Sequence, residues 1–268
     1  MKNETMKWQY LTTEKKDRIM IVRFDTGNRA NTLNTQLMLE LLQLARLLED
    51  DTELAAIIIT GKNNIFSGGF QLEKKAIDAE EVSFLASRNG AQLGARVCEA
   101  WERLEQMTIV AIEGWCVGGG VAIAIACDLR IVGQGATLYV PEIERGMNMS
   151  WGSVPRMVAL IGPAKTKRLF VMAQKLPASQ ALEWGVVDEV VADGRALDKA
   201  LQMANEIADL PPIPVRMCKQ AINAAAHALN HSVSFMDADQ NLLTAKTDDY
   251  QEAISAFLEK RDPVYQGQ

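Results

Sequence analysis

The chain has 268 residues and a formal net charge of −6, with 48% hydrophobic and 23% charged residues. This balance excludes an intrinsically disordered chain, and the acidic charge argues against nucleic acid as a partner. No apolar run approaches the roughly 20 residues that a membrane span requires, and the N-terminal MKNETMKWQY lacks the apolar stretch of a signal sequence.

Strand–helix–strand units dominate the first two thirds of the chain. Residues 18–24 alternate as a strand does, and residues 34–50 place leucines at helical spacing behind a capping residue at Asn34 or Thr35. The β-branched run at 55–60 predicts a strand that is buried on both faces. This alternation of element types favours an α/β fold.

The next segments continue the same order. A glycine-containing loop at 65–70 precedes a mostly helical stretch at 79–105. A second buried strand is predicted over 107–114, and it leads into a small-residue apolar helix at 119–126. Four cysteines without a CxxC spacing indicate buried free thiols in a reducing compartment, so we expect a cytoplasmic protein.

The sequence pattern becomes helical after Pro163, with a short exception at 185–191, and three or four amphipathic helices are predicted up to the end of the chain. No linker-like or low-complexity tract interrupts the sequence. We therefore predict a core over residues 1–195, which carries the functional site, and a helical C-terminal region over 196–268 in the same structural unit.

Two glycine loops are candidates for ligand binding: F-S-G-G-F at 66–70 and G-G-G at 118–120. The second lies where a strand gives way to a helix, whose first N–H groups lack partners within the helix. Neither the P-loop nor the dinucleotide-binding spacing of glycines is present. Two loop amides that converge on one oxygen would form an oxyanion hole, and we expect the N–H groups of Phe70 and Gly119 to be these donors.

Four motifs in this order resemble the enoyl-CoA hydratase/isomerase (crotonase) superfamily: F-S-G-G-F, E-G-W-C-V-G-G-G…A-C-D, P-E-I-E-R-G and F-L-E-K-R-D-P. The resemblance covers nearly the whole chain. It implies a crotonase-like spiral of ββα repeats whose helical C-terminal region trimerises, giving a homotrimer or homohexamer. It also implies an acyl-CoA thioester substrate whose enolate is stabilised by the two loop amides. Coenzyme A would be part of the substrate, and no cofactor would be bound permanently.

The carboxylates near such an enolate decide the reaction. Hydratases that this chain resembles carry one glutamate in the helix after the GGG loop, where this sequence has Ala122. The second family glutamate corresponds to Glu142, and Ser150 stands where some relatives hold an aspartate. A lone carboxylate can take a proton from the α-carbon and return it elsewhere, which is double-bond migration, and its burial would raise its pKa. Isomerisation of Δ3 to Δ2 enoyl-CoA is therefore favoured.

Other reactions of the superfamily remain open. The stretch at 114–129 is similar to hydroxycinnamoyl-CoA hydratase-lyases, which add water with one glutamate. Carboxymethylproline synthases share the single glutamate, so carbon–carbon chemistry is also an alternative. A non-catalytic acyl-CoA-binding member is a further one, with Ala122 marking the lost chemistry.

The resemblance also suggests residues that bind the substrate. Arg29 and Lys260 are the cations expected at the coenzyme phosphates. Trp151 is expected to line an acyl pocket with Met147, Met149 and Met157. The full set of expected binding residues is Arg29, Ala30, Gly68, Gly69, Gly118, Trp151, Phe257 and Lys260.

Other reactive side chains carry weaker signals. His227 and His231 are four residues apart, but no HExxH pattern or third ligand accompanies them, so we expect no metal site. Ser67 and Ser153 lie outside the G-x-S-x-G motif of a nucleophile. Glu144 would share a face with Glu142 if that segment were a strand.

Overall fold

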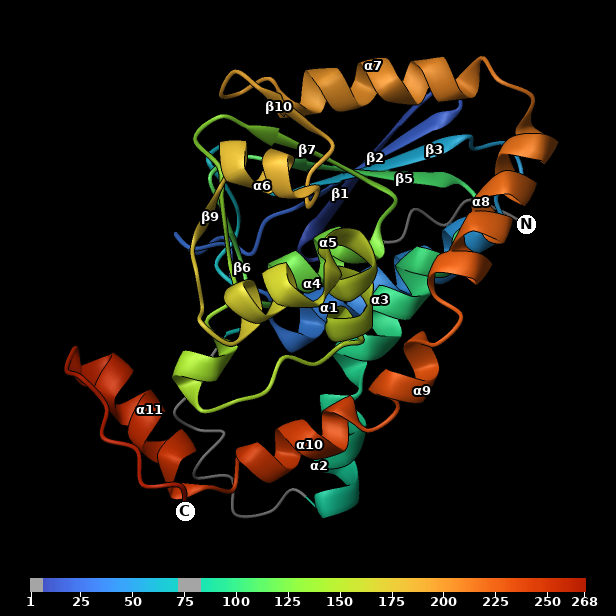
Figure 1. The fold of residues 1–268 in the computed structure, drawn as a ribbon. Helices are drawn as coiled ribbons and strands as arrows, with labels where there is room; N and C mark the ends of the chain where they lie inside the picture. Colours follow the sequence, from blue (N-terminus) through green and yellow to red (C-terminus); the bar gives the residue numbers. More distant parts are fainter. Residues whose placement is uncertain (1–6, 72–82) are drawn as a thin grey trace.

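The strands form two sheets in the computed structural model, which describes residues 7–71 and 83–268 (Figure 1). The larger sheet has the order β1-β2-β3-β5-β7-β10, and the smaller one has the order β4-β6-β8-β9. The larger sheet comprises β1 (Leu11–Lys16), β2 (Ile19–Phe24), β3 (Ala56–Thr60), β5 (Met107–Ile112), β7 (Leu129–Gly133) and β10 (Glu189–Val191). The smaller sheet comprises β4 (Ile65–Ser67), β6 (Trp115–Val117), β8 (Thr137–Tyr139) and β9 (Leu176–Pro177).

From β3 to β8, consecutive strands alternate between the two sheets. Each of β3, β5 and β7 lies in the larger sheet and is followed by β4, β6 or β8 in the smaller one, after which helices return the chain to the larger sheet. This is the predicted spiral of ββα repeats, which is confirmed. The edge strand β1 was not predicted, because its sequence LTTEKK is exposed beyond Leu11 and carries almost no apolar signal.

Successive residues of the central strands face two separate cores, as the period of two requires. Ile57 and Ile59 belong to the main core, whereas Ala56 and Ile58 belong to a second one. Helix α7 (Ala196–Ala208) covers this second face with alanines one turn apart, which permit close approach to the sheet. The prediction of a strand buried on both faces is therefore confirmed. It follows that α7 packs on the core although it lies C-terminal to the boundary predicted at 195.

Of the helices in the main core, the first begins behind a capping side chain and the fourth is buried throughout. Helix α1 (Thr35–Glu49) starts behind Asn34, whose side chain accepts a hydrogen bond of 2.9 Å from the Leu37 N–H. The stretch predicted as mostly helical at 79–105 contains α2 (Phe84–Ala91) and α3 (Leu93–Arg103), while its first residues at 79–82 lie outside the described residues. Helix α4 (Gly119–Ala126) is buried along its whole length, because every residue in it is small or aliphatic.

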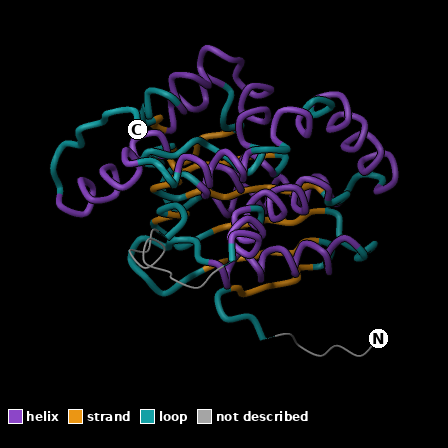
Figure 2. The backbone as a smooth tube through the Cα atoms, turned by 90° about the horizontal axis from the view of Figure 1, so that it is seen from below, coloured by secondary structure: helices purple, strands orange, loops and turns teal. Residues whose placement is uncertain are grey.

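Helices make up most of the chain after β8, and in the view of Figure 2 they lie over and beside the strands. Helix α5 (Ser153–Phe170) is kinked at Gly162, and α6 (Ala178–Trp184) precedes β10. The last four helices are α8 (Pro212–Ala226), α9 (Asn230–Ser234), α10 (Asp237–Thr244) and α11 (Asp248–Glu259). With α7, the described region past residue 195 therefore holds five helices rather than the three or four expected.

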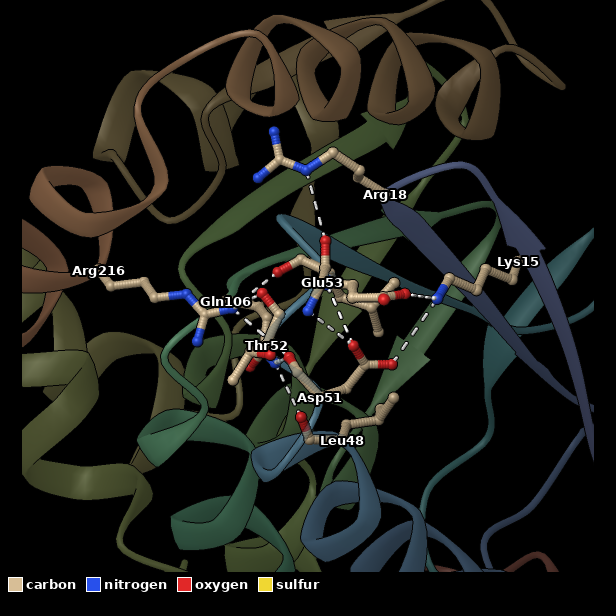
Figure 3. A network of polar contacts seen from close by, with 9 residues as sticks. Lys15, Arg18, Leu48, Asp51, Thr52, Glu53, Gln106 and Arg216 are labelled. Carbon is tan, nitrogen blue, oxygen red and sulfur yellow. Dashed lines mark hydrogen bonds and ion pairs between the residues drawn. The ribbon is translucent and has the colours of Figure 1, made fainter. Parts of the chain in front are cut away.

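A polar network fixes α8 to the turn that precedes β3 (Figure 3). The Gln106 side-chain amide donates to the carbonyls of Leu48 and Asp51, at 2.8 and 2.7 Å. Arg216 of α8 donates to the carbonyls of Thr52 and Leu54, at 3.2 and 3.0 Å. The carbonyls of Thr52 and Leu54 lie outside any helix or strand, so the bonds from Arg216 give them partners and tie α8 to this turn.

The cysteines differ in their burial. Three cysteines are buried as expected, but Cys218 is exposed, because α8 turns it away from the core. Among residues 7–71 and 83–268, no helix is both long enough and apolar enough to cross a bilayer.

Candidate active site

Three neighbouring strands of the smaller sheet lead into one site. Strands β4, β6 and β8 are parallel, so their carboxyl ends lie at the same edge. The F-S-G-G-F loop follows β4, the GGG loop follows β6, and Pro141-Glu142 follows β8. Ligands of open α/β sheets bind beyond the carboxyl ends of parallel strands, so this edge is the expected place for a substrate.

The Phe70 amide is directed away from its own bridge partner. In the parallel bridge between Leu33 and Phe70, the Leu33 N–H donates to the Gly69 carbonyl and the Gln71 N–H donates to the Leu33 carbonyl, both at 2.8 Å. In this pattern the hydrogen bonds go to the residues that flank Phe70. The Phe70 N–H therefore points away from Leu33 and can bind a ligand oxygen.

The Gly119 amide stands at the start of α4. Gly118, which precedes it, has φ 50° and ψ −114°, a conformation that is open in practice only to glycine. The Gly118 N–H donates to the Tyr139 carbonyl at the end of β8, at 2.8 Å, which pins the loop to the neighbouring strand. Because Gly119 is the first residue of the helix, its N–H has no partner within it and lies at the positive end of the helix dipole.

Glu142 lies directly against this loop. Its carboxylate occupies the space where a Cβ on Gly118 would stand. Its Oε2 atom is buried without a hydrogen-bond partner among the described residues. Burial raises the pKa of Glu142 to about 7, and the nearby Arg145 only partly opposes this shift. A carboxyl group with such a pKa can both accept and return a proton at neutral pH.

The segment around Glu142 is a 3-10 helix, Glu142–Arg145, rather than a strand. Glu144 therefore does not share a face with Glu142, and its carboxylate accepts a hydrogen bond from the Tyr139 hydroxyl instead. Ile143 is 44% exposed, so it contributes little to the burial of Glu142. The expected rise in the pKa of Glu142 is confirmed, and its carboxylate is packed against Gly118.

The Trp151 indole forms one wall of the site. Its ring meets the Phe70 ring edge to face, with 6.0 Å between the ring centroids. A Cβ at Gly119 would stand 2.6 Å from Trp151 Cζ3, so the indole also rests on the first residue of α4. On its other edge the indole packs against Gly94 at the start of α3. Trp151 therefore touches both residues whose amides form the expected oxyanion hole.

A cavity of about 400 Å³ brings Phe70, Gly119, Glu142 and Trp151 together. Glu142 is the sole carboxylate among the described residues that line it. Met157 was expected in the acyl pocket. It lies in the main core instead, because it is on the buried side of α5. The remaining lining residues include Thr35, Met38, Ser87, Leu93, Met147, Asn148, Met149, Ser150, Asn241 and Leu242.

The other expected binding residues lie in two further places. The Ala30 carbonyl accepts a hydrogen bond of 2.7 Å from the Gly68 N–H, which holds the F-S-G-G-F loop, and Arg29 beside it is exposed. Phe257 and Lys260 line a second cavity of about 570 Å³ rather than the first. There the Arg145 guanidinium lies 3.9 Å from the Phe257 ring centroid. The roles of these residues at the coenzyme remain predictions.

His227 and Ser67 have structural partners, whereas the buried Ser153 hydroxyl has no hydrogen-bond partner among the described residues. His227 Nδ1 lies 2.6 Å from Glu102 Oε1, and the Ser67 hydroxyl accepts a bond from the Gly69 N–H. Across the two described ranges, 7–71 and 83–268, no group of three or more metal-ligating side chains is found. Sequence reasoning missed the ion pair of Glu102 with the buried Arg156, because α3 and α5 carry several charged residues and nothing local marks these two as buried partners.

Comparisons with known proteins agree with this geometry. The family profile described as enoyl-CoA hydratase/isomerase matches residues 14–268. The chain is similar to the short-chain-enoyl-CoA hydratase of Clostridium acetobutylicum, with 30% identity over 249 residues that cover 92% of this chain and 94% of the relative. It is also similar to a probable mitochondrial enoyl-CoA hydratase of Dictyostelium discoideum, with 31% identity over 95% of this chain and 90% of that one. The crystal structure of carnitinyl-CoA hydratase from Mycobacterium avium superposes with a TM-score of 0.85 at 27% identity, covering 97% of this chain and 99% of that one.

Proposed function

This chain belongs to the enoyl-CoA hydratase/isomerase family, and from that premise we propose that it isomerises a Δ3-enoyl-CoA thioester to the Δ2 form. Coenzyme A enters as part of the substrate, and the chain needs no permanently bound cofactor. The Phe70 and Gly119 amides bind the thioester oxygen, and Glu142 moves the proton.

Each step of the proposed reaction uses groups that line the cavity. Glu142 takes a proton from C2, and the electron pair of that C–H bond moves into a dienolate whose negative oxygen accepts hydrogen bonds from the two amides. An oxyanion-hole donor contributes roughly 3–4 kcal/mol to such a transition state. Glu142 then delivers the proton to C4, and the double bond comes to lie between C2 and C3.

The observation that carries this proposal is the single carboxylate. Among the described residues that line the cavity, Glu142 alone can exchange a proton near neutral pH. At the position where the resemblance places the other hydratase glutamate, Ala122 is 1% exposed and offers no acid group. One carboxyl suffices for isomerisation because the proton it removes is the proton it returns.

Hydration is the second candidate, and the printed names of the relatives favour it. The proteins compared above are hydratases of enoyl-CoA or carnitinyl-CoA. In this alternative Glu142 takes a proton from water, the water oxygen bonds to C3, and the proton reaches C2. Carbon–carbon chemistry would use the same enolate with a different electrophile.

Mass spectrometry in heavy-oxygen water separates these candidates. The purified protein is mixed with 3-enoyl-CoA and 2-enoyl-CoA esters of several chain lengths. We expect conversion of the 3-enoyl ester without uptake of heavy oxygen. Rapid uptake by the 2-enoyl ester would instead show that Glu142 activates water. If a folded protein bound both esters and converted neither, it would be a non-catalytic acyl-CoA-binding member.

The raised pKa of Glu142 predicts the pH dependence of the rate. Glu142 must be ionised to accept the α-proton, so kcat/KM should rise with pH through about 7 and level off above it. A solvent-exposed glutamate would give the same rise near pH 4.3. Initial rates of 3-hexenoyl-CoA isomerisation between pH 5 and 9 test this, and a rate that is flat from pH 5.5 upward would contradict it.

We also expect a homotrimer or homohexamer in the cytoplasm. The support for self-association is a pair of large apolar side chains one turn apart on α8, Ile213 and Met217, which are 70% and 63% exposed. Large apolar side chains grouped in this way are typical of protein interfaces.

A further inference from the structure

Both polar groups of one peptide bond beside the cavity are held by charged side chains. The Trp151 carbonyl accepts a hydrogen bond of 2.9 Å from Arg156 Nη1. On the other side of the same peptide plane, the Gly152 N–H donates to Asp237 Oδ2, also at 2.9 Å. Hydrogen bonds to ionised groups are roughly twice as strong as neutral ones, so this peptide plane is fixed from both sides.

The peptide needs this support because its conformation is unfavourable. Trp151 has φ 60° and Gly152 has φ 66°, so two successive residues lie in the left-handed region. A bulky residue such as tryptophan adopts a positive φ only at a cost, which the surrounding structure must offset. A side chain at Gly152 is excluded as well, because its Cβ would stand 2.6 Å from Arg156 Nη1.

The two clamping residues are anchored on separate elements. Arg156 of α5 is 5% exposed and forms a bidentate ion pair with Glu102 of α3, at 2.9 and 2.8 Å. Asp237 is 7% exposed and belongs to the first turn of α10, far along the chain. Burial raises the pKa of Asp237, which the bond from Gly152 partly offsets. The clamp thus joins α3, α5 and α10 at one peptide.

The conformation of this peptide decides where the Trp151 indole lies. With φ at 60°, the ring enters the space between Gly94 and Gly119 and meets the Phe70 ring. If Trp151 relaxed to an ordinary φ, its Cα–Cβ bond would turn and the indole would leave that space. Gly119 and Phe70 would then lose their contacts with the indole, which add to the backbone hydrogen bonds of their loops.

We propose that Asp237 and Arg156 are positioning residues that clamp the Trp151–Gly152 peptide. Through this clamp, the Trp151 indole keeps the Phe70 and Gly119 amides in position to bind the thioester oxygen. This inference rests on the proposed function of those amides. A contact that strengthens as charge develops affects kcat more than KM, so misplaced amides should lower kcat selectively.

The experiment replaces Asp237 and measures both the reaction rate and the fluorine resonance of the Trp151 indole. The protein is labelled with 5-fluorotryptophan, and the resonance of Trp151 is identified by its absence in Trp151→Phe. In Asp237→Ala we expect this resonance to shift or broaden. With 3-hexenoyl-CoA as the probe, we expect kcat to fall at least tenfold while KM changes less than threefold. If Asp237→Ala does not fold, Asp237→Ser tests the same loss with a smaller cavity.

Two variants separate positioning from general support of the helix. Asp237→Asn keeps an oxygen that can accept the Gly152 N–H, so it should retain kcat within threefold and leave the resonance in place. Asp239→Ala is the matched control, because Asp239 lies in the same first turn but pairs with Arg88 of α2. It should leave the Trp151 resonance unmoved and change kcat less than twofold.

The proposal is overturned if Asp237→Ala leaves kcat within twofold of the parent value or leaves the Trp151 resonance unmoved. It is also overturned if Asp239→Ala reproduces both effects, since α10 would then act as a whole. The fluorine spectrum does not depend on turnover. If the parent protein converts no enoyl-CoA, the proposed function fails, while an unmoved or shifted Trp151 resonance still decides whether Asp237 fixes the indole.

Discussion

Glu142→Gln is expected to lower kcat for 3-enoyl-CoA isomerisation by at least about 10³-fold, within the range that general acid–base groups contribute. The glutamine amide has the shape of the carboxyl but neither accepts nor returns a proton at neutral pH. No other carboxylate among the described lining residues can replace it. The measurement is the steady-state rate with 3-hexenoyl-CoA, accompanied by thermal melting to show that the variant is folded.

Glu144→Gln is the matched control for this variant. Glu144 lies two residues farther on in the same 3-10 helix, but its carboxylate accepts from the Tyr139 hydroxyl and is outside the cavity lining. We expect it to keep kcat within threefold. If Glu142→Gln retained more than a tenth of the parent rate, the assignment of the proton transfer to Glu142 would be wrong.

Gly118→Ala is expected to have the second largest effect, a loss of about 100-fold or more in kcat together with about 1–3 kcal/mol of stability. The added Cβ would displace the Glu142 carboxylate, whose Cδ lies 3.3 Å from the Cβ position. The backbone at φ 50° and ψ −114° is also strained for alanine, and relaxing it would move the Gly119 amide. Steady-state rates and thermal melts measure the two losses.

Gly185→Ala separates backbone strain from the contact with Glu142. Gly185 ends α6 with φ 83°, and the atom nearest to its Cβ position is the Leu160 carbonyl oxygen at 3.9 Å. This variant should lose about 1 kcal/mol of stability with kcat unchanged. A Gly118→Ala protein with the parent kcat would show that the approach of Glu142 to this loop is irrelevant to the reaction.

Local chemistry made much of the site predictable from the sequence. The glycines at 68–69 and 118–120 mark loops after buried strands, and Asn34 caps its helix through its own side chain. Parallel pairing then brings the ends of β4, β6 and β8 to one edge, so Phe70, Gly119 and Glu142 meet in one cavity. The two loops were predicted from their glycines, whereas Glu142 was expected only because of the resemblance to the family.

Long-range contacts were beyond such reasoning. Asp237 is 85 positions away from the Gly152 amide that it binds, and a positive φ at Trp151 has no local sequence signature. Met157 was assigned to the pocket by its neighbours in sequence, yet the turn of α5 carries it into the core. The edge strand β1 was missed for a related reason, because pairing with β2 rather than burial makes it a strand.

The central claim, that one carboxyl removes and returns the proton, is tested most directly with a 3-enoyl-CoA that carries deuterium at C2. The ester is converted in ordinary water under single-turnover conditions, and the deuterium at C4 of the 2-enoyl product is measured by mass spectrometry. If the buried Glu142 carboxyl, whose pKa is raised to about 7, both takes and delivers the proton as proposed, deuterium should appear at C4 well above background. Hydrogen at C4 that comes entirely from solvent would contradict a single-glutamate shuttle.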